Sequence, residues 1–151
     1  MSRQRLLAIL NQAGMGDRVV TFDEGAHTAA EAAAAIGCEV GAIGSSLVFM
    51  KGDEPVLIVT SGAHRVDLTR VADHLGGALK RATPDQVREA TGFVIGGVSP
   101  VGFPMPVTLL VDEDLAEHDK VWVAAGHPNA VFWLTYAELL ELTGGTPLQV
   151  A

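Results

Sequence analysis

The stretch Thr91-Gly92-Phe93-Val94-Ile95-Gly96-Gly97-Val98-Ser99-Pro100-Val101-Gly102-Phe103-Pro104 is the most informative part of this chain. An apolar run leads into two adjacent glycines, which can adopt positive φ or let another group come close to the backbone. The serine that precedes the proline is biased towards an extended conformation. We therefore predict a rigid loop with few side chains at a strand end, whose backbone N–H and C=O groups suit a small polar group.

Two common phosphate-binding motifs do not fit this stretch. The glycine spacing is not Gly-x-Gly-x-x-Gly, and the strand and helix expected around a dinucleotide fingerprint are lacking. No Gly-Lys-Ser/Thr occurs anywhere, so a P-loop is absent. The residues alone leave open whether the loop binds a ligand or is only a structural turn.

Composition and charge place the chain among ordinary globular proteins. It has 151 residues, of which 48% are hydrophobic and 19% charged. This length predicts one domain spanning residues 1–151 with a proper core. The formal net charge of −8 opposes strong non-specific binding to nucleic acid, so DNA is not an expected partner.

The expected location is the cytoplasm. The single Cys38 cannot form an internal disulfide, and the N-terminal residues resemble a helix rather than a signal peptide. No apolar run approaches the roughly 20 residues that span a bilayer, so no membrane association is expected.

Periodicity and capping signals predict helices that alternate with strands. Three Ser/Thr-x-x-Glu/Gln capping boxes, beginning at Thr28, Thr83 and Thr135, each open a predicted helix. Further helices are predicted over 3–13 and 67–75. The predicted strands cover 18–22, 42–50, 55–60, 106–111, 120–124, 130–134 and an edge strand at 147–150.

These elements predict a single α+β fold. We expect a mixed, largely antiparallel sheet of about six or seven strands, barrel-like and surrounded by four or five helices. The residues 51–54 between two strands read as a hairpin turn.

Several polar residues are candidates for chemistry. Ser45 and Ser61 could act as nucleophiles, but neither lies in a Gly-x-Ser-x-Gly elbow, and hydrogen bonding at a strand end is the simpler interpretation. The five histidines and Cys38 show no metal-type spacing, so we expect no metal and no cofactor. His127, in a tight loop after a strand, is the histidine we most expect to face a ligand.

The basic residues cluster in one part of the chain. Six of the ten lie between positions 51 and 88, namely Lys51, Arg65, Arg70, Lys80, Arg81 and Arg88. Solvated helix faces would explain them; alternatively, they form a positive face on an acidic protein that receives a polyanion.

Five blocks of this sequence resemble the YbaK/prolyl-tRNA-synthetase-associated editing domain family over nearly the full chain. The block from Thr91 to Gly102 is the most specific of them. The others, in chain order, begin at Thr28, Ile43, Ser61 and Ala125. The resemblance implies a free-standing domain that hydrolyses the ester of mischarged tRNA, typically tRNA for proline carrying a wrong small amino acid. It also implies a metal-free mechanism that uses water or the substrate's own terminal ribose hydroxyl.

The resemblance implies site residues as well. Those expected at the reacting ester are Ser45, Gly96, Gly97 and Ser99. Those expected to bind the rest of the substrate are Phe22, His27, Ser46, Gly62, Pro100, Gly102, Gly126 and His127. Those expected to bind tRNA are Lys51, Arg65, Arg70, Lys80 and Arg81. The implied partners are an aminoacyl-tRNA and, in addition, a prolyl-tRNA synthetase or an elongation factor.

One departure from the family pattern concerns Ser45. The family motif Ile-x-Lys-Ser/Thr-Leu has a lysine at this position, and a hydroxyl cannot supply the point charge of an ammonium group. Arg65 or Lys51 could replace it. The alternative function is a weakened or silent homologue that binds a small molecule, tRNA or a synthetase. A third possibility is a serine hydrolase acting on another small ester or amide.

Overall fold

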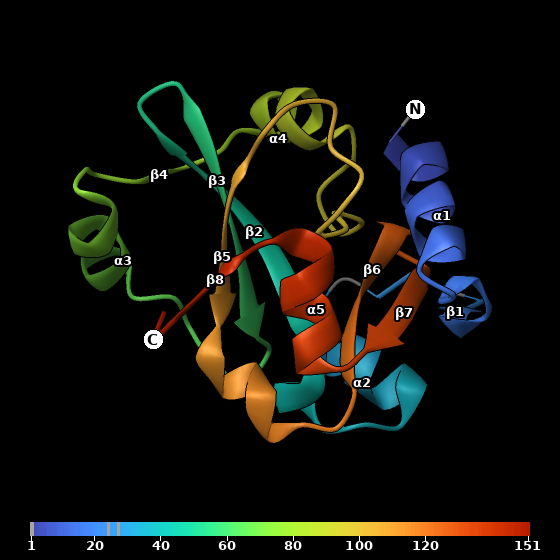
Figure 1. Cartoon of the computed structure of the whole chain (residues 1–151). Coiled ribbons are helices and arrows are strands. Elements are labelled where there is room, and N and C mark those ends of the chain that lie inside the picture. Colours follow the sequence, from blue (N-terminus) through green and yellow to red (C-terminus); the bar gives the residue numbers. More distant parts are fainter. Residues whose placement is uncertain (1, 24, 27) are drawn as a thin grey trace.

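A computed structural model describes residues 2–23, 25–26 and 28–151. In this part of the chain, five α-helices and eight strands alternate (Figure 1). The helices are α1 (Ser2–Gln12), α2 (Ala29–Ile36), α3 (Leu68–Leu75), α4 (Pro84–Thr91) and α5 (Tyr136–Thr143). The strands are β1 (Val19–Thr21), β2 (Gly44–Lys51), β3 (Glu54–Ser61), β4 (Lys80–Arg81), β5 (Thr108–Asp112), β6 (Val121–His127), β7 (Ala130–Leu134) and β8 (Thr146–Leu148). Short 3-10 turns occur at Gly16–Arg18, Val40–Ala42 and Glu113–Glu117.

The strands form two sheets. A three-stranded sheet has the order β1-β7-β6, and a five-stranded sheet has the order β4-β2-β3-β5-β8. Pairing is antiparallel except for β3 with β5 and β5 with β8, which are parallel. The sheets meet where Ile43, just before β2, forms a parallel bridge with Trp122 of β6. The mixed α+β class expected from the sequence is confirmed.

Strand β3 shows why the five-stranded sheet is buried on both sides. Successive side chains of a strand point to opposite faces. Leu57 and Val59 point into the main core, which also contains Leu6 of α1. Val56 and Ile58 point the other way and pack with Val71 of α3 in a second core. Figure 1 shows α3 on one side of the molecule and α1 far from it, against β6 and β7.

Local chemistry sets most helix ends. The capping boxes at Thr83 and Thr135 are both complete, with side-chain and backbone partners exchanged as expected. At Thr28 the side chain accepts from the Glu31 N–H, and the return bond to the Thr28 N–H is not formed. Glycines in the left-handed conformation end α2, α3, α4 and α5.

Two expectations differ from the structure. Residues 93–95 form no strand: the glycine loop follows α4 directly, and only Phe93 of the apolar run is buried, at 3% exposure. Strand β4 was not expected, because two residues carry no recognisable period. None of the helices in the described part of the chain has the length and apolar composition needed to cross a lipid bilayer.

Candidate active site

A pocket lies where the two sheets separate along β2. Strand β2 pairs with β3 along its whole length, but β4 pairs with its other edge only at Phe49 and Met50. The bridge at Ile43 joins the opposite end of that edge to β6. Residues 44–47 between these two attachments therefore have an open edge, and this edge lines the pocket.

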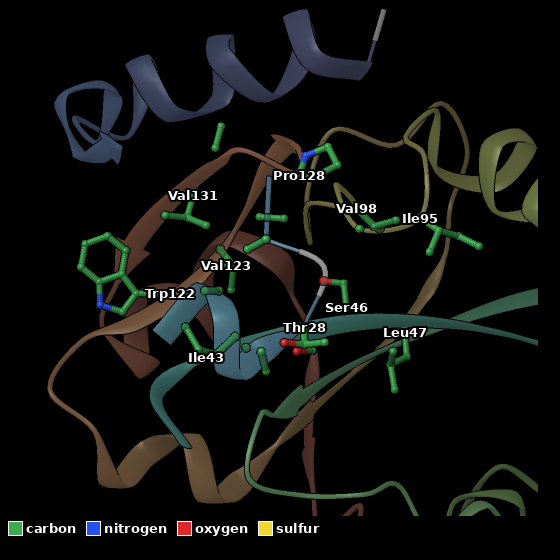
Figure 2. Close-up of a pocket in the computed structure, with 18 of the residues that line it drawn as sticks. Thr28, Ile43, Ser46, Leu47, Ile95, Val98, Trp122, Val123, Pro128 and Val131 are labelled. Atoms are coloured by element: carbon green, nitrogen blue, oxygen red, sulfur yellow. The ribbon is translucent and has the colours of Figure 1, made fainter. Parts of the chain in front are cut away.

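The pocket has a volume of about 240 Å³ and draws its walls from five regions of the chain (Figure 2). The described residues that line it are Ala26, Thr28, Ala29, Ala32, Ile43, Gly44, Ser45, Ser46, Leu47, Arg81, Ile95, Gly96, Val98, Trp122, Val123, Ala124, His127, Pro128, Ala130 and Val131. Most are small or apolar, so the pocket suits a small ligand. Arg81 is the single lysine or arginine among them, and none of them is a carboxylate.

Three residues that line this pocket carry polar groups without a partner in the described part of the protein. The Ser46 hydroxyl is buried and has no hydrogen-bond partner among the described residues. The backbone N–H groups of Gly96 and Val98 have no acceptor in the same part of the protein, whereas the Gly97 N–H donates to the Val94 carbonyl at 2.9 Å. Buried polar groups are normally satisfied, so the unpartnered Ser46 hydroxyl in the pocket indicates a place for a ligand. The exposed Gly96 N–H is a donor that a ligand can reach.

The glycine loop is held against the end of β6 by a contact that only glycine allows. A Cβ atom on Gly97 would lie 2.9 Å from the His127 Cα and 3.0 Å from its nitrogen. The His127 ring is fixed in turn, since its Nδ1 accepts from the Asn129 N–H at 3.1 Å. Gly97 therefore supports the pocket from behind, while Gly96 and His127 line it.

Five of the expected site residues line this pocket. They are Ser45, Ser46, Gly96, His127 and Arg81. The structure places several others behind its walls. Ser99 is fully buried, with its hydroxyl 3.5 Å from the Val101 N–H. Gly102 packs on α1, where a Cβ atom would lie 2.9 Å from the Ser2 carbonyl oxygen.

The remaining expected substrate-binding residues also support rather than line the pocket. Gly62 packs against the Val40 carbonyl, and Gly126 packs against the Phe93 ring. The Phe22 N–H donates to the Asn129 carbonyl at 2.7 Å, and Pro100 is buried in the loop. His27 lies outside the described residues.

The basic residues are spread over several elements. Lys51 ends β2 at the hairpin and contacts Gly77, so it does not fill the position opposite Ser45. Arg65 lines a second pocket, and Arg70 and Lys80 are exposed and line neither pocket. The expectation that Arg65 or Lys51 replaces the missing lysine is therefore wrong for the first pocket, where Arg81 is present instead.

Ser61 is not activated by His64. Its hydroxyl donates to the Gly41 carbonyl at 2.8 Å and is 3% exposed. The His64 Nδ1 instead lies 2.8 Å from Asp112, and its Nε2 lies 3.3 Å from Asp114. A nucleophile needs its hydroxyl hydrogen-bonded to the base, so the Ser61 hydrolase hypothesis is wrong.

The cluster of His64, Asp112 and Asp114 has a structural explanation. Its ligand-type atoms lie within 4.8 Å of one another, but both ring nitrogens face a carboxylate. Asp112 is 1% exposed and also accepts from the Ser61 N–H at 2.9 Å and the Asp114 N–H at 3.0 Å. These bonds fix the loop after β3 to the end of β5.

Sequence reasoning missed the apolar lining of the pocket. Part of this lining comes from Trp122 of β6, Val131 of β7 and Ile95 of the glycine loop. These residues come together only because segments distant in sequence pack against one another, and no local pattern predicts that. Ile95 did carry a signal, because it is an apolar residue directly before two glycines. In the structure it is 58% exposed and lines the pocket. Thr28 was recognised only as a helix cap, although it also lines the pocket.

Comparison with known proteins agrees with this geometry. Residues 23–142 match the family described as the aminoacyl-tRNA editing domain. A solved structure described as a candidate trans-editing enzyme for prolyl tRNA synthetase superposes with a TM-score of 0.91 and 44% identity, covering 99% of this chain and 96% of the other. The multifunctional Ser/Thr-tRNA deacylase ProXp-y of Escherichia coli is 33% identical over 94% of this chain and 88% of its own length.

The fold and pocket thus define an editing domain of the α+β type seen in these proteins. This chain belongs to the aminoacyl-tRNA editing domain family. The proline–tRNA ligase of Levilactobacillus brevis also contains a similar region, 28% identical over 83% of this chain, which corresponds to 22% of that ligase.

Proposed function

We propose that this protein is a trans-editing deacylase that hydrolyses the ester bond of mischarged aminoacyl-tRNA. The amino acid enters the 240 Å³ pocket between the sheets, and the terminal ribose lies at its mouth. The observation that carries this proposal is the set of unpartnered groups at the pocket wall, the Gly96 and Val98 N–H groups and the Ser46 hydroxyl.

The chemistry follows from these groups. A water molecule attacks the ester carbonyl, and negative charge develops on the carbonyl oxygen. Fixed backbone N–H groups stabilise that charge because they need no reorganisation during the reaction. The bond from the carbonyl carbon to the ribose oxygen then breaks, and the proton from water passes to the ribose oxygen. The products are the free amino acid and uncharged tRNA.

The described lining residues support substrate-assisted hydrolysis better than covalent catalysis. They include no carboxylate to act as general base, and Ser45 and Ser46 have no histidine hydrogen-bonded to them in the described part of the chain. The neighbouring ribose hydroxyl of the substrate can position the water in place of an enzyme base. His127 lines the pocket, but its Nδ1 is occupied by the Asn129 N–H.

Pocket size favours small amino acids as substrates. Alanines at positions 26, 29 and 32 form one wall, and Val98, Val131 and Trp122 narrow the rest. One methylene group changes the discrimination between two amino acids by only about 1–3 kcal/mol. Several small amino acids of similar size should therefore all be substrates. We propose tRNA for proline as the carrier, because relatives include a region of a proline–tRNA ligase and a candidate trans-editing enzyme for that synthetase.

The test is release of amino acid from tRNA for proline charged with alanine, serine, cysteine, threonine or 2-aminobutyrate. Proline on the same tRNA is the control and should remain attached. Release of at least one of these small amino acids is expected. Absence of release from all five at high enzyme concentration would contradict the proposal.

A second candidate function is a silent homologue that binds its ligand without hydrolysis. The observation that favours it is Ser45, which lines the pocket at the position where the resembling family has lysine. The Ser45→Lys variant separates the two. A large gain in deacylation would support a silenced site, and a loss would show that serine is adapted to this pocket.

A further inference from the structure

A second pocket adjoins the first and has no role in the function proposed above. It has a volume of about 250 Å³ and is lined by Leu47, Phe49, His64, Arg65, Val66, Leu68 and Arg81. Leu47 and Arg81 line both pockets, so these two residues form the boundary between them. Figure 2 shows Leu47 at the end of the first pocket that lies away from Trp122.

The second pocket combines an apolar surface with positive charge. Leu68, the first residue of α3, is 40% exposed and adds apolar surface to this pocket. Arg65 and Arg81 are exposed, and their guanidinium groups form no ion pair or hydrogen bond with any described residue. The backbone N–H groups of Arg65 and Val66 are likewise without an acceptor in the described part of the chain.

The loop that carries Arg65 is held rigidly. Its His64 ring lies between Asp112 and Asp114, and the Asp67 N–H donates to the Val150 carbonyl at 2.7 Å. Both nitrogens of the His64 ring are occupied, so this residue anchors the loop and does not offer a free nitrogen to a ligand. The loop at this pocket is therefore held in place without a ligand. The guanidinium groups of Arg65 and Arg81 and the N–H groups of Arg65 and Val66 remain available to a partner.

A nucleotide has the chemistry that these groups fit. Bases stack on apolar surfaces and on guanidinium planes, and phosphate oxygens accept from arginine and from free backbone N–H groups. In an aminoacyl-tRNA, the amino acid, the base and the 5′-phosphate all extend from one terminal ribose. A ribose at the boundary formed by Leu47 and Arg81 would direct the amino acid into the first pocket and the base into the second.

We propose that the second pocket holds the 3′-terminal nucleotide of the tRNA, with Arg81 binding its 5′-phosphate. This inference rests on the proposed deacylase function and assigns a new site to it. Arg81 is a binding residue shared by the two pockets, and Arg65 assists it from the rigid loop. The base packs on Leu47, Val66 and Leu68.

The test compares two minimal substrates, 3′-alanyl-adenosine with and without a 5′-phosphate. Arg81→Gln should lower kcat/KM for the phosphorylated substrate by roughly 10- to 100-fold, the loss typical of a charged hydrogen bond. For the substrate without phosphate the same variant should change kcat/KM by less than about 3-fold. Arg88→Gln is the matched control, since Arg88 is an exposed arginine of α4 that lines neither pocket.

Two kinetic outcomes would overturn the inference while leaving deacylation established. One is an equal effect of Arg81→Gln on both substrates. The other is an equal effect of Arg81→Gln and Arg88→Gln on the phosphorylated substrate, which would indicate general electrostatic attraction.

A binding experiment keeps the inference testable if no substrate is hydrolysed. Adenosine 5′-monophosphate is titrated into the protein with labelled methyl groups. Shifts at Leu47, Val66 and Leu68 that Arg81→Gln abolishes are expected. Shifts confined to Val98 and Val131 of the first pocket, or no saturable shifts at all, would overturn the inference. Loss of hydrolysis with these shifts retained would contradict only the proposed function.

Discussion

At the scale of single residues, the buried Ser46 hydroxyl should lower the stability of the fold while it contributes to activity. A buried polar group without a partner costs about 1–3 kcal/mol. We expect Ser46→Ala to leave thermal stability unchanged or raise it, because its hydroxyl has no partner in the described protein. The same variant should lower kcat/KM for deacylation by roughly 3- to 10-fold if the hydroxyl donates to the substrate.

Thr91→Ala is the matched control for Ser46→Ala. The Thr91 hydroxyl is also buried, but it donates to the Val87 carbonyl at 2.7 Å and accepts from the Phe93 N–H at 3.1 Å. Denaturation curves should show a loss of about 1–2 kcal/mol for Thr91→Ala and none for Ser46→Ala. A clear loss of stability in Ser46→Ala would show that its hydroxyl is satisfied in solution.

At the level of elements, Arg18 connects the turn before β1 to β7 and α5. Its guanidinium lies 2.8 Å from Glu138 and stacks 3.9 Å from the centre of the Trp133 ring. Loss of the pair and the stacking in Arg18→Gln should cost about 1–2 kcal/mol at neutral pH. Arg88→Gln is the control, because Arg88 pairs only loosely with Asp85, at 3.7 Å on the exposed face of α4.

The Arg18 effect should depend on pH with a known sign. The hydrogen bond from Arg18 holds the pKa of Glu138 below its ordinary value of 4.5. Because the pKa of Glu138 is lower in the folded state than in the unfolded state, its ionised form stabilises the fold at pH values above the unfolded pKa. This stabilisation is lost as the pH falls through the folded pKa. The difference between wild type and Arg18→Gln in urea denaturation should therefore shrink below about pH 4.5. A difference that stays constant down to pH 3 would contradict this linkage.

The contact between the glycine loop and the end of β6 is a second connection between elements. Gly97→Ala places a Cβ atom 2.9 Å from backbone of His127, which cannot move aside as a flexible side chain would. We expect a loss of about 1–3 kcal/mol and a larger proportional loss of deacylation, since the two segments form facing walls of the pocket.

Gly25→Ala provides the comparison for Gly97→Ala. Its Cβ atom would lie 3.4 Å from the Pro128 Cβ, an ordinary contact with the loop after β6. Thermal denaturation and kinetics of the two variants in parallel separate a clash from a general effect of replacing glycine. Equal behaviour of the two variants would refute the role assigned to Gly97.

Helices and strands that are created by interactions between residues close in sequence were predictable, and those created by distant pairing were not. The helices at Thr83 and Thr135 were predicted because their capping boxes lie within four residues of sequence. The hairpin of β2 and β3 was predicted for the same local reason. The strand β4 was not, because it exists only through the pairing of Arg81 with Phe49 and Lys80 with Met50.

The site could be predicted only where motif residues line the pocket directly. Ser45, Ser46, Gly96 and His127 do so. Ser99 and Gly102 belong to the same distinctive block but serve packing, and no local pattern distinguishes the two roles. Arg81 was expected in a basic cluster, yet its place at the boundary of two pockets depends on a register across the sheet.

For the molecule as a whole, Asp112 joins two segments that are distant in sequence, because its bonds to Ser61 and His64 span 51 and 48 residues. Its carboxylate, at the end of β5, receives bonds from the end of β3, from the His64 loop and from the Asp114 N–H. Asp112→Ala leaves the buried Ser61 N–H and the partly buried His64 and Asp114 donors without this acceptor and should cost about 1–3 kcal/mol in free energy of unfolding. Asp114→Ala, at a carboxylate that is 47% exposed, should cost less than about 1 kcal/mol. Similar losses in the two variants, measured by urea denaturation, would contradict the anchoring role of Asp112.

The walls of the first pocket come from five regions of the chain, so the pocket exists only in the folded protein. No fragment of the unfolded chain retains the arrangement, so a ligand that fills the pocket binds the folded state alone. Such a ligand at 100 times its dissociation constant stabilises the fold by about 2.7 kcal/mol. Melting temperature measured against ligand concentration therefore reports affinity without any turnover, and a non-hydrolysable amide analogue of the aminoacyl ester can be ranked in this way across amino acids.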